Sequence, residues 1–509
     1  MSLDRPWILA GALAYLGLVL LIGLWSLGRT RNARDFFIAG QGAGLAVTAL
    51  GTMAAAFSGF LFIGGPGLTY RLGVGSFFIA LPVSLTGGLL CWSVGRRLRR
   101  LAAVREVYTV PDVVLARWGS RRAAALAALA VLVGSVAYLG AQLLALAVLL
   151  DSIFGLSNLF GGAGLPLAMI VGVVVITLYS TAGGMVAGVY TDGFQGLLML
   201  LAAGGVVHYA LESGGGAASI TRRIATSSAF DAGFLDPLGG PLGMLGAMGF
   251  FLVFSLGVLG QPQMLHKFFM LDDERKLRWM PLVLGGSQAL VVLLWLAIGL
   301  AVPALVASGR LEPLAVADEA APRFLLGFVP DALAGLVFAG VLAAIMSTAD
   351  SFVNLAAAAL VRDLPQAAGL RPRHQLAWGR LVSLLLPAAA GLAALASGEL
   401  VALLGTFAFG IFGAALAPTL AIGLGWRRIS ARAARWSIGG GLALSLGLEA
   451  STRGLLPGVP AVSLPAAAPS LLALAGSFAL LFWVASLDDP AADPDDHEPP
   501  PDIAAALEL

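Results

Sequence analysis

Long apolar stretches dominate the chain, and short segments rich in charged residues, glycine or proline separate them. A helix that crosses a membrane needs about 20 mostly apolar residues. Thirteen stretches come near or above this length, and each predicts one membrane-spanning helix. They are 7–27, 44–70, 76–95, 123–150, 164–182, 186–211, 242–264, 281–306, 332–361, 377–397, 400–425, 433–450 and 470–487. Only the break at 179–184 separates the fifth stretch from the sixth.

Composition excludes a soluble protein. Hydrophobic residues make up 59% of the chain and charged residues 11%, whereas soluble domains carry about 25% charged residues. Most of the outer surface must therefore contact the lipid bilayer. The first stretch is too long for a signal peptide, lacks a clear small-residue cleavage site and runs into Arg29, Arg31 and Arg34. We therefore expect it to be a retained anchor.

The basic residues predict the orientation. The loops 28–43, 96–122, 265–280, 362–376 and 427–435 hold 22 Lys and Arg residues, whereas the alternate loops and the N-terminus hold seven. Basic residues concentrate in cytoplasmic loops. We therefore expect the N-terminus outside and the C-terminus in the cytoplasm of a cell with a bacterial-type inner membrane. An odd number of crossings agrees with termini on opposite sides.

The chain divides into repeats and accessory pieces. Residues 488–509 hold eight acidic residues and no basic one, and their Pro- and Asp-rich composition predicts a disordered cytoplasmic tail. The stretches 212–240 and 307–331 face outside and could carry short helices that shape an entrance. The predicted units are an extra helix with its loop (1–43), a first repeat (44–211), an outer loop (212–241), a second repeat (242–428), two additional helices (429–487) and the tail (488–509).

Two carboxylates at membrane depth are candidates for a functional site. Placing an ionisable side chain inside the membrane costs several kcal/mol, so such residues usually serve a function. Asp192 lies about seven residues into the sixth stretch, where it is either an interfacial carboxylate or part of an ion path. Asp350 shares its helix with Ser347, Thr348 and Ser351. Hydroxyls in such helices usually bond back to the carbonyl four residues earlier, so the stripe alone decides nothing.

Two stretches predict discontinuous helices. Gly59 and Pro66 interrupt the second stretch, and Gly257 and Pro262 interrupt the seventh. Interrupted helices at corresponding places in two halves are typical of a transporter site. The two stretches are five apart, which predicts two five-helix repeats (stretches 2–6 and 7–11). Because five is odd, the repeats are inverted relative to each other.

Six segments, in order along the chain, resemble the sodium:solute symporter family, which includes the proline, pantothenate, sialic acid and sodium/glucose cotransporters. They are 33–40 (ARDFFIAG), 56–67 (AFSGFLFIGGPG) with Tyr70 and Gly73, 183–195 (GGMVAGVYTDGFQ), 260–262 (GQP), 343–351 (AAIMSTADS) and 410–418 (GIFGAALAP) with Trp426 and Arg427. The resemblance implies an all-α protein with the LeuT-like inverted-repeat fold, and Na⁺-driven solute uptake by alternating access.

The resemblance also implies an ion site, with Na⁺ as the coupling ion. Its ligands fall on the carbonyls of Ala54, Phe57 and Ala344 and on the hydroxyls of Ser347 and Thr348. Na⁺ is a hard cation that prefers such oxygen ligands. Asp192 matches the family's acidic residue on the cytoplasmic ion path, and Asp350 matches a position that is polar in relatives.

The family's solute pocket implies a second set of residues. The candidates are Ser58, Gly59, Tyr138, Gln142, Phe254, Val258, Pro262 and Phe407. Proline-type members have Trp and Tyr where this chain has Phe254 and Val258, and Asp where it has Ala56, which counts against proline itself. A pocket with few polar side chains favours a small organic anion or an apolar amino acid, whose carboxylate would meet a helix N-terminus. Sugars fit it less well.

Several alternatives remain open. A proton-coupled relative could use Asp350, a sugar-type transporter shares the fold, and a transporter-like sensor would report solute to a cytoplasmic partner through the acidic tail. A membrane-embedded enzyme would need a metal cluster, a His-containing dyad or a nucleophile motif. The single Cys91 and four scattered His residues provide none of these. We therefore expect no enzymatic role and no nucleic-acid partner, and no pattern predicts an oligomeric state.

Overall fold

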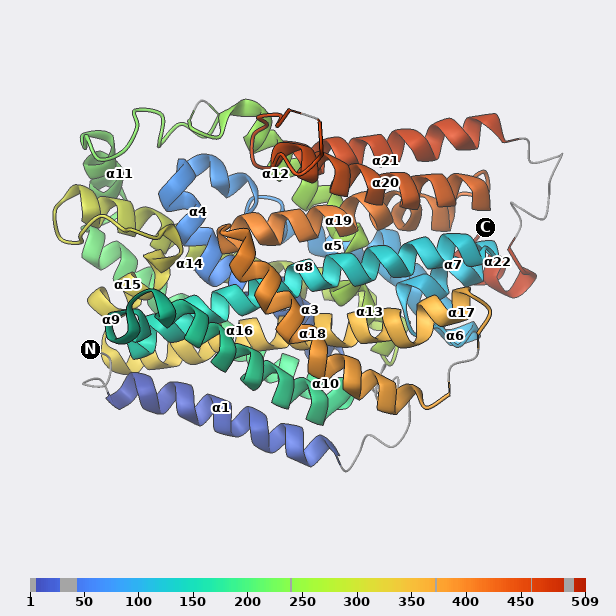
Figure 1. Cartoon of the computed structure of the whole chain (residues 1–509), viewed down its shortest axis with the longest axis horizontal. Coiled ribbons are helices and arrows are strands. Elements are labelled where there is room, and N and C mark those ends of the chain that lie inside the picture. The colour runs from blue at the N-terminus through green and yellow to red at the C-terminus, as the bar shows by residue number, and fades with distance from the viewer. Residues whose placement is uncertain (1–5, 28–43, 239, 371–372, 459, 489–498) are drawn as a thin grey trace.

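The computed structural model of the chain describes residues 6–27, 44–238, 240–370, 373–458, 460–488 and 499–509. All regular elements in these ranges are helices, and most of them run along the long axis of the molecule (Figure 1). A helix satisfies its backbone N–H and C=O groups internally, which is required in hydrocarbon. The segment 33–40, which resembles the family, lies outside the described residues.

Helices in the first half of the chain occupy the predicted apolar stretches and also parts of the loops between them. They are α1 (Pro6–Leu27), α3 (Leu45–Ala56), η2 (Phe60–Gly64), α4 (Gly65–Leu72), η3 (Gly73–Phe78), α5 (Val83–Leu90), η4 (Cys91–Gly95), α6 (Arg96–Val104), α7 (Val110–Trp118), α8 (Arg121–Phe154), α9 (Leu156–Phe160), η5 (Gly161–Ala163), α10 (Gly164–Gly214) and α11 (Ala217–Ala225).

The second half contains the remaining elements. They are α12 (Gly243–Gly257), η6 (Val258–Gly260), α13 (Pro262–Met270), η7 (Glu274–Arg278), α14 (Met280–Ala307), η8 (Ala317–Glu319), α15 (Ala320–Phe328), α16 (Asp331–Ala358), η9 (Ala359–Asp363), α17 (Leu364–Ala367), α18 (Gln375–Ser397), α19 (Val401–Ala421), η10 (Gly423–Gly425), α20 (Ala431–Thr452), α21 (Ala468–Leu487) and α22 (Pro501–Leu507).

The chain is a multi-pass membrane protein. In its described part nine helices are long and apolar enough to cross a membrane, and the bent pair Leu45–Ala56 and Phe60–Phe78 makes ten. The predicted total of thirteen membrane-spanning helices stays a prediction.

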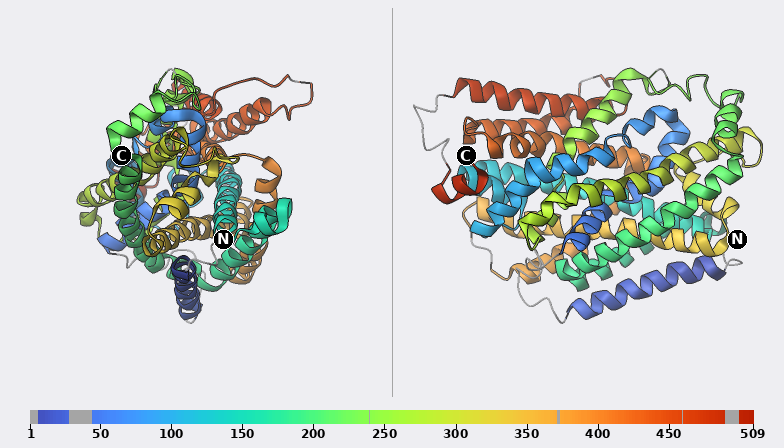
Figure 2. Two further views of the ribbon diagram at one scale, coloured as in Figure 1. Left: turned by 90° about the vertical axis from the view of Figure 1, so that its left-hand side faces the viewer. Right: turned by 180° about the vertical axis from the view of Figure 1, so that it is seen from behind.

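The predicted break at 179–184 lies within one helical element, α10, which covers both the fifth and the sixth stretch. The neighbours of its two ends, α9 and α11, nevertheless lie at the same end of the molecule (Figures 1 and 2). The chain therefore reverses direction within the residues of α10. Two separate parts of this region, Leu156–Leu178 and Thr191–Gly214, are each long and apolar enough to cross a membrane.

The two ends of the bundle differ in what they carry. The start of α1 and the short helices α11 and α15 lie at one end, here named the α11 end, and α6, α17 and α22 lie at the other, the α22 end (Figure 1). Short helices were expected in both 212–240 and 307–331, and α11 and α15 confirm this. The start of α1 and the C-terminal residue Leu509 thus lie at opposite ends of the molecule.

The predicted disordered tail needs a correction. Within 488–509, residues Pro501–Leu507 form the helix α22, and its side chains Ile503 and Leu507 are buried. Pro at the first helical position and two apolar residues four apart favour a short amphipathic helix. The Pro- and Asp-rich average of the tail concealed this pattern. Residues 489–498 lie outside the described residues.

α16 lies at the centre of the bundle, and every residue from Val337 to Ala358 on it is buried. It packs against α1, α8 and α10. A helix that is apolar and small on all sides can be surrounded in this way. Its few polar residues, including Ser347, Thr348 and Asp350, are therefore held inside the protein and away from lipid.

Candidate solute and ion site

The first discontinuous helix is present as predicted. α3 ends at Ala56, Phe57 adopts extended backbone angles (φ −98°, ψ 105°), and the helix resumes as η2 at Phe60. The two parts are bent by 50°. The break removes some carbonyls of the last turn of α3 from helical hydrogen bonds, so they can face other ligands.

Two hydrogen bonds hold this break. The backbone N–H of Gly59 donates to Gln142 Oε1 on α8 (2.9 Å), and the N–H of Phe60 donates to Ser58 Oγ (3.2 Å). A Cβ at Gly59 would lie 2.5 Å from Cβ of Ala145, so only glycine fits. Ser58, Gly59 and Gln142 were predicted to bind solute, and the structure shows them bonded to the protein itself.

The second discontinuous helix is confirmed too. α12 ends at Gly257, Gln261 is extended (φ −76°, ψ 103°), and α13 begins at Pro262. Gln261 Nε2 donates to the carbonyls of Gly257 (3.0 Å) and Phe409 (3.1 Å), which bonds the break to α19. Pro262 therefore restarts the helix, which is a common position for proline. The discontinuous helix α3–α4 and the discontinuous helix α12–α13 run in opposite directions (Figure 1).

Several predicted ion ligands meet between α3 and α16. Thr348 Oγ1 lies 3.3 Å from the carbonyl oxygen of Ala54 and donates to it. Ser347 Oγ donates to Asp192 Oδ1 at 2.7 Å. All of these side chains are buried. The structure thus joins the hydroxyl pair, the freed end of α3 and the predicted ion path in one polar cluster. The hydroxyls of Ser347 and Thr348 bond to Asp192 and to the Ala54 carbonyl, and not, within the described part of the chain, to the Phe57 or Ala344 carbonyl.

Lys267 is the residue that sequence reasoning missed. Its Nζ contacts Asp192 Oδ2, and the two side chains are 4% and 3% exposed. The predicted seventh stretch ends at 264, which left Lys267 in a loop and among the 22 loop cations. α13 instead continues to Met270. The neighbours Met264, Leu265, Phe268 and Phe269 are all apolar, and this pattern was the signal that the helix goes on.

Asp350 lies on the same stretch of α16 and is buried as well, at 4% exposure. Ser180 and Asn354 lie beside its carboxyl group, and Asp192 and Lys267 are near enough to act on it electrostatically. On the other side of the cluster, Gln195 Nε2 donates to Tyr15 Oη at 2.6 Å. The polar cluster therefore extends from α1 through α10 to α16.

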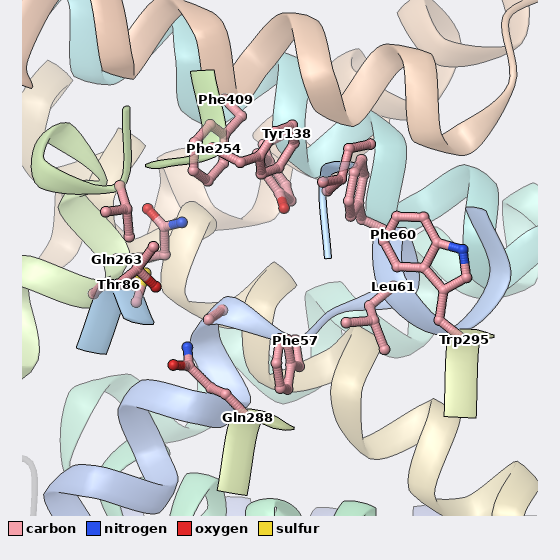
Figure 3. Close-up of a pocket in the computed structure, with 14 residues that line it drawn as sticks. Phe57, Phe60, Leu61, Thr86, Tyr138, Phe254, Gln263, Gln288, Trp295 and Phe409 are labelled. Carbon is pink, nitrogen blue, oxygen red and sulfur yellow. The ribbon is translucent and has the colours of Figure 1, made fainter. Parts of the chain in front are cut away.

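A pocket lies beside both breaks (Figure 3). Of the predicted solute residues, Tyr138, Phe254 and Val258 line it. The other lining residues are Ala56, Phe57, Phe60, Leu61, Ile79, Thr86, Gln263, Met264, Gln288, Trp295 and Phe409. Its cavity volume is about 40 Å³, which has room for a few water molecules and is smaller than the usual small-molecule pocket. No charged side chain is among its lining residues.

Aromatic rings form the apolar walls of this pocket. The ring of Phe254 stacks on Phe409 (centroids 4.3 Å apart) and on Phe60 (5.5 Å), and Phe60 meets the edge of Trp295 (6.1 Å). Such rings favour an apolar or planar guest. Phe60 and Trp295 lie on one side of the pocket in Figure 3, and Gln263 and Gln288 lie toward the other.

Two amide groups supply the polar side. Gln263 Nε2 donates to Gln261 Oε1 (3.3 Å), while Gln263 Oε1 and Gln288 Oε1 have no hydrogen-bond partner among the described residues. Both side chains are buried, at 2% and 1% exposure. Buried polar groups are normally satisfied, so these oxygens are acceptors for a donor group on a guest. Gln263 directly follows the predicted break at Pro262, whereas no signal in the chain pointed to Gln288.

Phe407 does not line this pocket, contrary to the prediction. It lines a different cavity together with Glu399, Glu449 and Arg453, whose guanidinium lies 5.9 Å from the centre of the Phe407 ring. Residues two apart on a helix point about 200° apart. Phe409 therefore faces the pocket in place of Phe407.

Comparisons with known proteins agree with this geometry. A family model described as the sodium:solute symporter family matches residues 36–441. The sodium/pantothenate symporter of Haemophilus influenzae is 27% identical over 76% of this chain and 78% of that protein. The sodium/proline symporter of Escherichia coli is 28% identical over 84% of this chain and 85% of that protein.

Solved structures show the same fold. The substrate-bound, outward-open state of a Na⁺-coupled sialic acid symporter superimposes with a TM-score of 0.72 at 18% identity, over 95% of this chain and 98% of that one. A nucleobase-cation-symport-1 family transporter in a closed conformation gives a TM-score of 0.53 at 16% identity, over 92% and 100%. The LeuT-like arrangement of inverted repeats with broken first helices is therefore confirmed. The chain belongs to the sodium:solute symporter family, and its role is Na⁺-coupled solute transport rather than an enzymatic reaction.

Proposed function

We propose that the protein imports a small solute with an apolar body and a hydrogen-bond donor at one end, coupled to Na⁺. The observation that carries this proposal is the position of the pocket between two broken helices. Its aromatic walls suit the apolar body of such a solute once the pocket widens to admit it, and the unpaired oxygens of Gln263 and Gln288 suit its donor. An amino acid with an apolar side chain, whose ammonium group is the donor, satisfies both requirements.

A carboxylate at the start of η2 is supported less well. The N–H groups of Gly59 and Phe60 are bonded to Gln142 and Ser58, and the N–H of Leu61 donates to the Ser58 carbonyl (2.9 Å). A carboxylate would have to compete with these contacts. We therefore place recognition on the donor group and the apolar body of the solute, and only secondarily on an acid group.

Na⁺ is proposed to bind where Thr348 meets Ala54, with the Phe57 and Ala344 carbonyls and the Ser347 hydroxyl completing an oxygen cage. A neutral cage binds Na⁺ weakly enough to release it in each cycle. We infer that Asp192 receives the ion next, because it already accepts a hydrogen bond from Ser347. Lys267 would balance the charge of Asp192 whenever no Na⁺ is nearby.

A proton-coupled cycle is the second candidate, and one observation favours it. Asp350 is buried beside Ser180 and Asn354 and forms no ion pair with any of the described residues. Burying an unpaired charge is costly, and a bound proton would remove it. The two mechanisms differ in which gradient drives uptake.

We further propose that the α22 end faces the cytoplasm of a bacterial-type cell and that the N-terminus faces outside. The excess of basic residues in the loops of the α22 end supports this. Maleimide labelling of Ser219→Cys on α11 in intact cells tests it, since a membrane-impermeant reagent should label this site from outside. Labelling only after the membrane is opened would contradict the proposed orientation.

Uptake into proteoliposomes tests the coupling. With radiolabelled L-leucine, L-proline and pantothenate as probes, an inward Na⁺ gradient should drive accumulation of at least one, and a pH gradient alone should not. Thr348→Val should abolish the response to Na⁺. The control Thr419→Val, which removes a buried hydroxyl from a different helix, α19, should retain it. Accumulation driven by the pH gradient and indifferent to Na⁺ would favour the proton-coupled candidate.

Competition tests recognition of the solute. Against a transported probe, isoamylamine should compete and isocaproate should not, because only the amine provides a donor for Gln263 and Gln288. Gln263→Leu should reduce the difference between the two compounds. Equal competition by both would overturn the proposed role of the amide oxygens while leaving Na⁺ coupling intact.

A further inference from the structure

The C-terminal helix α22 lies against α6 at the α22 end of the bundle (Figures 1 and 2). Its contact has an apolar part. Ile503 and Leu507, one turn apart, are each 2% exposed and belong to the same continuous buried cluster as the bundle core. Residues four apart on a helix share a face. α22 therefore docks with one side on the protein.

Ion pairs with arginines of the α6 region surround this apolar contact. Arg105 holds Asp502 with two hydrogen bonds, at 2.6 and 2.9 Å. Glu508 contacts Arg100 and lies 3.4 Å from Arg96. The guanidinium groups lower the pKa values of Asp502 and Glu508 below their usual range. Asp502 also lies in the first turn of α22, where a negative charge is favourable.

The same arginines reach the segment that follows α13. Arg96 and Arg100 contact Glu274 Oε1 at 3.1 and 2.7 Å. Arg99 Nε donates to the carbonyl of Leu271 at 2.6 Å. Leu271 directly follows α13, which is the second part of the broken helix beside the pocket. α6 thus lies between α22 on one side and the end of the broken helix on the other.

We propose that α22 is an intramolecular latch that restrains the α22 end of the site. Glu508 and Glu274 share two guanidinium groups, so Glu508 holds Arg96 and Arg100 in the position that binds the segment after α13. Ile503 and Leu507 anchor the latch by burial. When α22 leaves, these arginines gain freedom, and the end of α13 opens more often.

The contact suits a latch because it is of moderate strength. Exposed ion pairs contribute little individually and weaken with salt, since charges are screened over about 10 Å at 0.1 M and about 3 Å at 1 M. Arg105 and Asp502 have 49% and 42% of their side chains exposed. Two buried apolar side chains add a part that salt does not weaken. We therefore expect salt to release the latch partially.

Thiol accessibility tests this inference without knowledge of the solute. In a Cys91→Ala background, Met270→Cys places one reporter at the end of α13, where the native side chain is 1% exposed. Ala304→Cys places a second reporter at the α11 end, where the native side chain is 0% exposed. Both are reconstituted in neutral phosphatidylcholine vesicles, so that anionic lipid cannot replace α22, and labelled with a small permeant maleimide.

Deleting residues 499–509 should raise the labelling rate of the Met270→Cys reporter by about fivefold or more, because the open population increases. The Ala304→Cys reporter should stay within about twofold. An increase at both reporters would indicate general destabilisation, and an unchanged Met270→Cys rate would mean that α22 restrains nothing. Either result would overturn the proposal.

Charge variants distinguish specific docking of α22 from a general effect of the acidic tail. Asp502→Asn with Glu508→Gln should raise Met270→Cys labelling in low salt and reduce its dependence on KCl. Asp493→Asn with Asp495→Asn removes the same charge from the tail outside α22 and should change nothing. Equal effects of the two double variants would contradict specific docking. Because no transport is measured, these results are independent of the proposed substrate and coupling ion.

Discussion

Two buried carboxylates illustrate how this protein handles charge away from water. Asp192 has a cation, Lys267, and a hydroxyl donor, Ser347. Asp318 in η8 accepts one hydrogen bond, from the backbone N–H of Val401 (2.9 Å), and its Oδ1 has no partner among the described residues. A buried charge is costly unless it is paired. The first carboxylate is therefore paired inside the protein, whereas the second is adapted to hold a proton.

Removing Lys267 should show how much the stability of the fold depends on the Asp192–Lys267 pair. Lys267→Met leaves Asp192 buried without its cation, which should lower the free energy of unfolding by about 3–5 kcal/mol. Asp192→Asn with Lys267→Met should recover most of this loss, because neither charge then remains. Thermal unfolding of the detergent-solubilised variants in KCl measures both effects. Additive losses in the double variant would show that the two side chains are not coupled.

Asp318 should make stability depend on pH. Burial raises the pKa of this carboxyl to about 7, with smaller opposing effects of the Val401 N–H and Arg71. The folded state then binds the proton more tightly than the unfolded state. The stabilisation should be complete below about pH 4 and should be lost as pH rises through 7, by at most about 1.4 kcal/mol per pH unit.

Melting temperatures between pH 5 and 8 check this expectation. Asp318→Asn should flatten the pH dependence, whereas Asp231→Asn, at an exposed position in the 212–240 stretch, should leave it unchanged. A wild-type slope that survives in Asp318→Asn would assign the pH dependence to another group.

At the scale of elements, the broken helices were predictable and their side-chain contacts were not. Gly59 and Pro262 mark the breaks because glycine and proline change local backbone preferences. Which residue faces the pocket depends on helix rotation, so Phe407 was predicted where Phe409 lies. Lys267 was missed because its ion partner is 75 residues away in the chain, and the amphipathic pattern of α22 was too short to stand out from its acidic surroundings.

The break at Gly59 should tolerate no side chain. In Gly59→Ala the new Cβ would lie 2.5 Å from Ala145 and 2.9 Å from Ile345, and such overpacking costs about 1–3 kcal/mol. Gly286→Ala in α14 is the matched control, because nothing lies within 4 Å of its Cβ position. Chemical unfolding should show a loss for the first variant and none for the second. Equal stability would mean that the break can relax.

For the whole molecule, both ends of the site are tied to peripheral segments. At the α11 end, Asp318 bonds the start of α19 and packs against Gly67 of α4. At the α22 end, α6 links α22 to the segment after α13. The family fold and the two discontinuous helices followed from the sequence. The tertiary ties at the two ends did not, since each joins residues more than 80 positions apart.

The central claim is that Na⁺ binds between the freed end of α3 and the hydroxyls of α16. Equilibrium binding of ²²Na⁺ to the purified protein tests it most directly. Wild type and Thr419→Val should bind Na⁺ saturably and K⁺ should not displace it, whereas Ser347→Ala and Thr348→Val should each weaken binding by about tenfold or more. Unchanged Na⁺ binding in both site variants would contradict the account.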